Sequence, residues 1–190
     1  MRAEPPIGRE PLGCGHAMNI IHCIEDHHSG PILEILNEAI VTSTALYDYH
    51  PRGIETMGPW FEAKRAGGFP VVGAVDDAGQ LLGFATYGTF RVFPAYKYTV
   101  EHSVYVHRDH RGQGVGTAVM KRLIALAGEH QQHVMVGAID AANAASIAFH
   151  ERLGFARCGV VRQAGFKFGR WLDLSLYQLV LATPGQPVDG

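Results

Sequence analysis

The chain has 190 residues, of which 47% are apolar and 18% charged, and a formal net charge of −2 at pH 7. This length and composition suit one soluble globular domain with a complete core. No long basic run and no apolar stretch of about 18 residues occurs. We therefore expect neither a nucleic-acid partner nor a membrane span.

The two ends of the chain differ in pattern from the rest. Residues 1–17 are rich in proline and glycine and lack periodicity, which predicts a disordered leader without a secretion signal. The regular periodicity of residues 18–183 predicts a single domain, and we expect residues 184–190 to form a flexible tail. The three cysteines share no close spacing, which argues against a disulfide framework or a zinc knuckle. We therefore expect a reducing, cytoplasmic compartment.

Strand and helix periodicities alternate through the first half of the domain. A strand is predicted from Met18 to Ile24, and apolar residues at helical spacing predict a helix from Pro31 to Ile40. A polar and aromatic loop follows over residues 42–50. The next elements are a helix ended by a glycine pair and the two strands of a hairpin, over residues 54–66, 71–75 and 81–87.

The second half adds further strands and two helices. Valines favour a strand from Tyr98 to Val106, and a glycine-rich loop at residues 111–116 opens a helix to about Gly128. Apolar residues recur every four positions in that helix and predict a buried stripe, at Val115, Val119, Leu123 and Ala127. A strand, a short helix and two strands complete the chain, over residues 134–139, 144–153, 155–161 and 172–181. This order predicts an α/β domain with a mixed sheet.

The loop Arg111-Gly112-Gln113-Gly114-Val115-Gly116 has the features of an anion site. Glycine permits tight turns and close approach of a ligand, and the first N–H groups of the following helix have no intrahelical partner. The helix dipole and Arg111 add positive potential that favours a pyrophosphate. By itself, the loop is also compatible with a glycine-rich turn that has only a structural role. Its spacing matches neither a Rossmann fingerprint nor a Walker loop.

Two motifs together resemble one superfamily. Arg111-x-x-Gly114-x-Gly116 is similar to the Q/R-x-x-G-x-G/A signature of the GNAT N-acetyltransferases. Residues 143–155, which read Asn-Ala-Ala-Ser-Ile-Ala-Phe-His-Glu-Arg-Leu-Gly-Phe, resemble the second hallmark of that superfamily. The resemblance implies the GNAT fold, a central twisted mixed sheet flanked by helices, and acetyl-CoA as co-substrate.

Three more segments resemble the phosphinothricin and methionine sulfoximine acetyltransferase branch, at residues 91–94, 95–106 and 164–173. The first looks most like the methionine sulfoximine/sulfone subgroup. The resemblance implies acetylation of the α-amino group of a small amino-acid-like acceptor such as L-methionine sulfoximine, L-methionine sulfone or phosphinothricin, by a homodimer. Two alternatives stay open: another amine acceptor (a protein N-terminus, a polyamine or an antibiotic), and a non-catalytic acetyl-CoA-binding module.

Acetyl transfer to an amine needs a base, because an ammonium must lose a proton before it attacks. Glu101 lies in the strand that leads to the glycine loop. In the resembled family this glutamate is the general base, acting through water. Alternation along the strand would place Glu101, Ser103 and Tyr105 on one face. The alternative is a solvated strand carboxylate with no catalytic role.

The cofactor contacts are implied by the same resemblance. In this superfamily the pantetheine arm adds to the sheet like an extra strand, here along the backbone of residues 104–106. The implied acetyl-CoA contacts are Val104, Tyr105, Val106, Arg111, Gly112, Gln113, Gly114, Val115, Gly116, Thr117, Asn143 and Ser146. The position of Asn143 at a helix start also predicts a plain N-cap.

The histidines require separate interpretations. His150 stands where many superfamily members carry a tyrosine that protonates the leaving thiolate, so the resemblance implies a second catalytic residue. A helix-face histidine with a structural partner is the alternative. The pairs His27-His28 and His107-x-x-His110 have no further ligands at useful spacing, so we predict no metal site.

The acceptor site should bind an anion, because an amino-acid-like molecule carries a carboxylate. Arg91 is the best candidate ligand, and the alternative is a solvent-exposed arginine in a hairpin. The other predicted substrate contacts are Phe93, Tyr96, Glu101 and Lys167.

Overall fold

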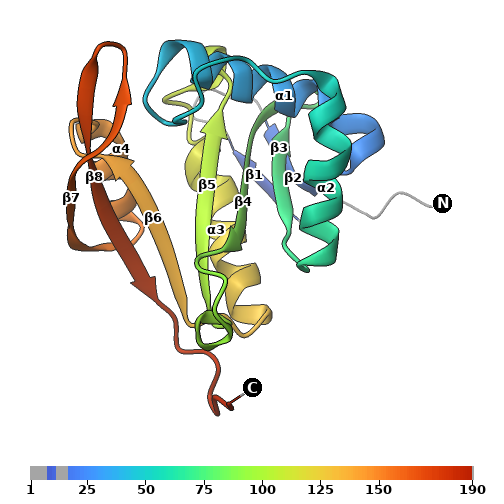
Figure 1. Cartoon of the computed structure of the whole chain (residues 1–190). Coiled ribbons are helices and arrows are strands. Elements are labelled where there is room, and N and C mark those ends of the chain that lie inside the picture. The colour runs from blue at the N-terminus through green and yellow to red at the C-terminus, as the bar shows by residue number, and fades with distance from the viewer. Residues whose placement is uncertain (1–7, 12–16, 190) are drawn as a thin grey trace.

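The computed structural model describes residues 8–11 and 17–189 of the chain. Within these ranges eight strands form one sheet in the order β1-β2-β3-β4-β5-β6-β8-β7 (Figure 1). Every neighbouring pair is antiparallel except β5 and β6, which run parallel. The strands are β1 Gly8–Pro11, β2 Ala17–His22, β3 Val71–Val75, β4 Leu81–Thr89, β5 Thr99–Val106, β6 Val134–Asp140, β7 Ala156–Lys167 and β8 Arg170–Val180.

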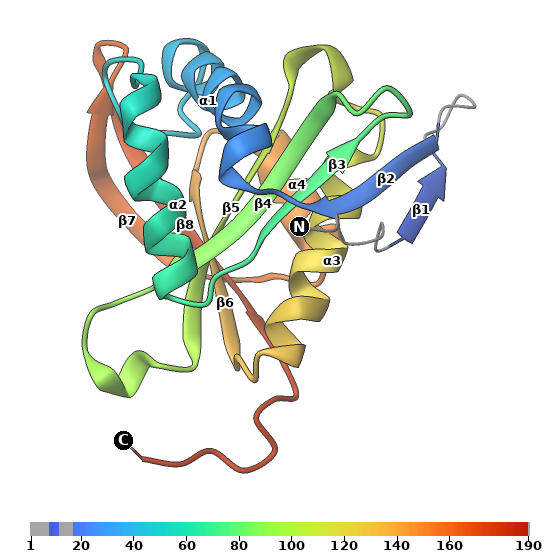
Figure 2. The same ribbon diagram turned by 90° about the vertical axis from the view of Figure 1, so that its right-hand side faces the viewer.

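Helices cover both faces of this sheet (Figure 2). The α-helices of the described residues are α1 Glu25–Thr42, α2 Met57–Ala66, α3 Val115–Glu129 and α4 Ala144–Arg152. Short 3-10 turns lie at Ile54–Thr56, Pro94–Tyr96 and Arg108–His110. Side chains of α1 and α2 belong to one buried apolar cluster, and those of α3 and α4 to the other. None of the described helices combines the length and apolar character of a membrane span.

Helix α3 shows how the sequence pattern produces the packing. The predicted stripe is confirmed, because Val115, Val119, Leu123 and Ala127 are all buried against the sheet. Their spacing puts them on one side of the helix. Each larger apolar side chain buried in this way stabilises the fold by about 1.5–3 kcal/mol relative to exposure.

The boundaries of the N-terminal elements differ from the prediction. Residues 8–11 form β1, so the segment predicted to be a disordered leader contains a strand; of the other leader residues, only Ala17, which starts β2, is described. The first helix begins at Glu25 and not at Pro31, which lies inside it. Two acidic residues in its first turn favour a helix start there. Ile24, predicted to end the strand, is the extended N-cap.

The C-terminal hairpin is longer than predicted. β7 continues to Lys167 and β8 begins at Arg170, although the stretch between the two predicted strands contains Gly165 and Gly169. Past the last strand, the Val188 N–H donates to the Tyr98 hydroxyl at 3.2 Å. The mobility of residues 184–190 stays a prediction.

Strands β5 and β6 separate part-way along the sheet. Their pairing covers only residues 99–101 against residues 134–136. Beyond this point β6 stays paired with β8 and β5 with β4, so the two halves of the sheet diverge (Figure 1). The edge of β5 that faces β6 therefore has no strand partner over residues 102–106 among the described residues.

Gly83 on β4 permits a close approach to β5. A Cβ there would lie 2.8 Å from the Tyr105 carbonyl oxygen, and backbone cannot move aside as a side chain can. We expect Gly83→Ala to lower the free energy of unfolding by about 1–3 kcal/mol. Gly128→Ala in α3 is the control, since a Cβ there meets nothing within 4 Å and alanine favours helix. Equal denaturation midpoints for the two variants would contradict this account.

Candidate active site

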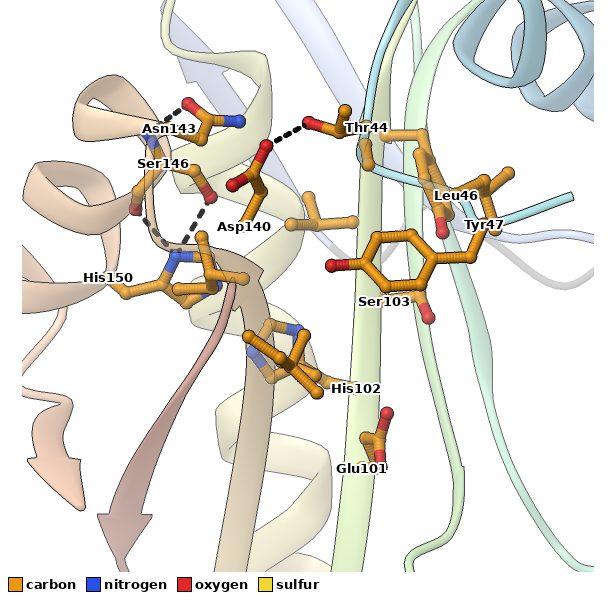
Figure 3. A pocket seen from close by; sticks show the side chains of 16 residues that line it. Thr44, Leu46, Tyr47, Glu101, His102, Ser103, Asp140, Asn143, Ser146 and His150 are labelled. Atoms are coloured by element: carbon orange, nitrogen blue, oxygen red, sulfur yellow. Dashed lines mark hydrogen bonds between the residues drawn. The ribbon is translucent and has the colours of Figure 1, made fainter. Parts of the chain in front are cut away.

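A cavity of about 310 Å³ occupies the opening between β5 and β6 (Figure 3). Its walls come from five parts of the chain: the segment after α1, the middle of β5, the end of β6, the start of α4 with its N-cap, and Leu174 of β8. The side chains that line it include Thr44, Leu46, Tyr47, Glu101, His102, Asp140, Asn143, Ser146 and His150. Segments far apart in the sequence therefore meet here.

Glu101 lines this cavity from β5 and is only partly exposed. It shares its strand face with Ser103 and Tyr105, as the alternation predicts. Tyr105 packs with the cluster under α1 and α2, whereas Val100 packs with the opposite cluster. Burial raises the pKa of Glu101 above its ordinary value, and the positive charge of Arg91 opposes that rise. A carboxylate with a raised pKa is a stronger base.

The glycine loop has the geometry of a helix-start anion site. Gly112 and Gly114 adopt φ values of +76° and +86°, which side chains other than glycine rarely adopt. Gly114 is the N-cap of α3, and the first intrahelical bond runs from the Ala118 N–H to the Gly114 carbonyl. The N–H groups of residues 115–117 precede that bond and lie at the positive end of the helix.

The side chains around the loop are already engaged. Arg111 is half exposed, pairs with Glu38 of α1 and donates from Nε to the Val106 carbonyl at 3.3 Å. The Gln113 amide donates to the Asp109 carbonyl at 3.0 Å. Val115 is buried, so only its backbone can contact a ligand. An anion at this helix start would compete with Glu38 for the Arg111 guanidinium.

The open edge of β5 leads from Glu101 toward this loop. Val104 and Tyr105 line the cavity, and Val106 follows just outside it. Because this edge has no strand partner, its backbone groups can pair with an extended ligand. Asn143 accepts from the Ser146 N–H at 3.0 Å, which confirms the predicted N-cap. Asn143 and Ser146 line the cavity from the opposite side.

His150 is buried in the wall formed by α4. Its Nδ1 lies 2.7 Å from the Ser146 carbonyl, so Nδ1 must carry the proton and donate it. Burial lowers the pKa of His150, and that hydrogen bond opposes the change. In the neutral ring Nε2 therefore has a lone pair, and it is buried without a partner among the described residues. Proton donation to a thiolate would require the charged ring or a ring flip.

His102 is a site residue that the sequence reasoning missed. Its ring stacks on His150 with centroids 5.0 Å apart and 27° between planes. Both ring nitrogens are buried and lack partners among the described residues. Burial, with a contribution from His150, lowers the pKa of His102 to about 3. The one signal in the sequence is Gly137, where a Cβ would lie 2.9 Å from the His102 Nε2.

Asp140, at the end of β6, was also missed. Its carboxylate accepts from the Thr44 hydroxyl at 2.6 Å, the Ala142 N–H at 3.0 Å and the Arg170 guanidinium at 3.1 Å. These bonds outweigh burial and hold the pKa of Asp140 below its ordinary value. Asp140 is thus a charged anchor for the cavity wall and is not a free base.

The predicted acceptor ligands Arg91, Phe93 and Tyr96 line a different hollow, of about 210 Å³, beside the loop before β5. The Arg91 guanidinium stacks 4.5 Å from the Phe90 ring centre and donates to the Phe90 carbonyl. Its charge still acts on Glu101. Within one chain, the Arg91 charge is therefore close enough to affect the pKa of Glu101, but the Arg91 side chain does not line the Glu101 cavity.

The prediction for Lys167 is corrected. The side chain is buried, and its ammonium donates to the carbonyls of Ile40, Ser43 and Leu46 at 2.7, 2.9 and 2.6 Å. All three N–H groups are used, so none is left for a substrate carboxylate. Burial lowers the pKa of Lys167, and the nearby Asp48 charge opposes the change.

Comparisons with known proteins agree with this architecture. The sequence profile of the acetyltransferase (GNAT) family matches residues 33–155. An L-methionine sulfoximine/L-methionine sulfone acetyltransferase of Pseudomonas paraeruginosa is 47% identical over 150 residues, which are 79% of this chain and 87% of that protein. A phosphinothricin N-acetyltransferase of Alcaligenes faecalis is 37% identical over 147 residues, 71% of this chain and 74% of that protein. The chain therefore belongs to the acetyltransferase (GNAT) family.

It is an N-acetyltransferase, and within the family it resembles the methionine sulfoximine and phosphinothricin branch. Solved structures confirm the predicted fold. A candidate acetyltransferase of Acinetobacter baylyi has a TM-score of 0.90 at 58% identity, covering 91% of this chain and 98% of that one. A phosphinothricin acetyltransferase of Sinorhizobium meliloti in complex with acetyl-CoA has a TM-score of 0.85 at 30% identity, covering 90% and 92%.

Proposed function

We propose that this enzyme transfers the acetyl group of acetyl-CoA to the α-amino group of a small amino-acid-like acceptor such as L-methionine sulfoximine, L-methionine sulfone or phosphinothricin. The observation that carries the proposal is the half-buried Glu101, which lines the cavity where the β5 edge opens. The relatives named for these acceptors support the acceptor class. We also propose that the enzyme acts in the cytoplasm.

The residues present fit acetyl-CoA. The unpaired edge of β5 offers backbone groups at Val104, Tyr105 and Val106 for an extended pantetheine arm. The N–H groups at the start of α3, with Arg111 beside them, suit a pyrophosphate. Of the remaining predicted contacts, Gly112 and Gln113 shape the turn, and Asn143 and Ser146 face the cavity from α4. The bound thioester would supply the acetyl group.

In the mechanism, Glu101 removes a proton from the acceptor ammonium through water, and the free amine forms the new C–N bond. A backbone N–H on the open β5 edge then stabilises charge on the carbonyl oxygen. As the C–S bond breaks, the nitrogen gives up its second proton to form the neutral amide, and the departing thiolate gains a proton. His150 delivers that proton only in its charged or flipped form, so solvent is the second source to consider. The cavity holds both reactants together, which lowers the entropic barrier.

We further propose that the acceptor carboxylate pairs with Arg91, and that a second copy of the chain packs near the loop before β5, which carries Arg91. Two groups of exposed apolar side chains support a homodimer: Val92, Phe93 and Tyr96 before β5, and Phe166, Phe168 and Trp171 at the β7–β8 hairpin. Such surfaces are uncommon on monomers. Analytical ultracentrifugation of wild type and of Phe93→Asp tests this, and a monomeric wild type would contradict it.

A thiol-release assay with acetyl-CoA tests the proposed function. The panel contains L-methionine sulfoximine, L-methionine sulfone and phosphinothricin, together with a polyamine, an aminoglycoside and a peptide with a free N-terminus. We expect release with at least one amino-acid analogue and none with the cationic amines. Release with only the polyamine, aminoglycoside or peptide would overturn the acceptor class. Binding of acetyl-CoA without release for any amine would identify a non-catalytic module instead.

A further inference from the structure

The segment after α1 forms one wall of the active-site cavity, with Thr44, Leu46 and Tyr47 lining it. Its residues form no helix or strand. It begins at the C-terminus of α1, where carbonyl groups lack intrahelical partners, and the last turn of α1 carries no basic side chain. The position of this wall, residues 43–47, therefore depends on contacts from elsewhere in the chain.

Lys167 supplies the central contact. Its ammonium donates to the carbonyls of Ile40, Ser43 and Leu46, one in the last turns of α1 and two in the wall. The side chain is buried, and only the charged form has three N–H groups for three acceptors. A positive charge is also favourable at the C-terminal end of a helix. One buried cation thus ties the wall to the end of β7.

Two neighbouring bonds strengthen the same connection. The Thr44 hydroxyl donates to Asp140, which also pairs with Arg170 at the start of β8. The Tyr49 hydroxyl donates to the Phe166 carbonyl at 2.8 Å. Of the two residues that flank the hairpin turn, Lys167 bonds directly to the segment that follows α1, whereas Arg170 is connected to it only through Asp140. Figure 1 shows the tip of the β7–β8 hairpin beside that segment.

We infer that Lys167 is a positioning residue for acetyl transfer: it braces the wall 43–47 against the β7–β8 hairpin and thereby sets the width of the acceptor cavity. The need for a brace follows from the separation of β5 and β6, whose pairing stops at Glu101 and Val136. Beyond that pair the two halves of the sheet share no strand hydrogen bonds among the described residues. Lys167 acts through the wall and does not touch the acceptor.

The test compares Lys167→Met with wild type, and Lys121→Met serves as a control because Lys121 is exposed on α3. Methionine keeps the length of the stem and removes all three donors. We expect amide hydrogen exchange in residues 43–47 to speed up, with exchange in α3 unchanged. We also expect the KM for the amino-acid acceptor to rise about tenfold, because a misplaced wall weakens positioning, while the KM for acetyl-CoA stays within about twofold.

The expected change in the acceptor KM rests on the proposed function, whereas the hydrogen-exchange measurement does not. If wild type acetylates none of the acceptors, the proposed function fails, and the exchange rates alone decide on the brace. Thr44→Val provides a milder variant that removes one bond from the same wall, and it should change exchange there in the same direction. Unchanged exchange of residues 43–47 in both variants, or an unchanged acceptor KM in a folded and active Lys167→Met, would overturn the inference.

Discussion

Replacing Glu101 by Gln is expected to lower kcat by about 100- to 10,000-fold, which is the usual contribution of a general base. The amide keeps the size of the side chain but cannot accept a proton. Binding of acetyl-CoA should stay within about twofold of wild type, because the predicted cofactor contacts lie on the backbone of β5 and at the start of α3. Steady-state kinetics and isothermal titration with acetyl-CoA measure the two effects separately.

The pH dependence of kcat/KM provides a second test of Glu101 as the base. The base acts only when deprotonated, and burial raises the pKa of Glu101. The acidic limb of kcat/KM should therefore lie above the ordinary titration range of a glutamate, and Arg91→Ala should move it to still higher pH. Glu55→Gln is the control, because Glu55 is exposed on the surface. Full turnover in Glu101→Gln would show that another group is the base.

The second large effect concerns stability in acid. The pKa of His102 is lowered to about 3 in the folded state, against an ordinary value of 6.5. Since the folded pKa lies below the unfolded one, the unfolded chain binds more protons between these values. The contribution of neutral His102 is present above pH 6.5 and is lost as the pH falls toward 3. Between pH 7 and pH 4.5 wild type should lose on the order of 2–3 kcal/mol through this group.

His102→Phe isolates that contribution. Phenylalanine keeps a planar ring beside His150 and Phe155 but does not titrate. The variant should lose less unfolding free energy on acidification than wild type, by about the amount given above. Urea titrations at the two pH values measure the difference, with His27→Phe as the control because His27 is exposed. Equal losses in wild type and His102→Phe would contradict the buried neutral state of His102.

The features that the sequence predicted well depend on local pattern. The α3 stripe follows from helical spacing, the start of α3 from the glycine turn before it, and the face of Glu101 from strand alternation. Strand β1 was missed because Gly8–Pro11 has a glycine, a proline and two charged residues, and its pairing with β2 overrides that weak propensity.

The features that were missed depend on long-range contacts. Lys167 bonds to carbonyls 121 to 127 residues earlier in the chain, so its own neighbours gave no sign of a structural role. His102 sits on the strand face opposite Glu101, and only its tertiary packing against His150 and Phe155 shows that its ring is buried. Arg91 looked like a cavity ligand because sequence proximity to Glu101 does not reveal which hollow its loop lines.

The most direct test of the central claim identifies the product. Acetyl-CoA labelled with carbon-13 in the acetyl group is incubated with the enzyme and L-methionine sulfoximine, L-methionine sulfone or phosphinothricin, and the mixture is analysed by nuclear magnetic resonance and mass spectrometry. The account predicts a labelled amide on the α-nitrogen with wild type, and about 1% of that rate or less with Glu101→Gln. A label on another atom, or no labelled product from any of the three, would contradict it.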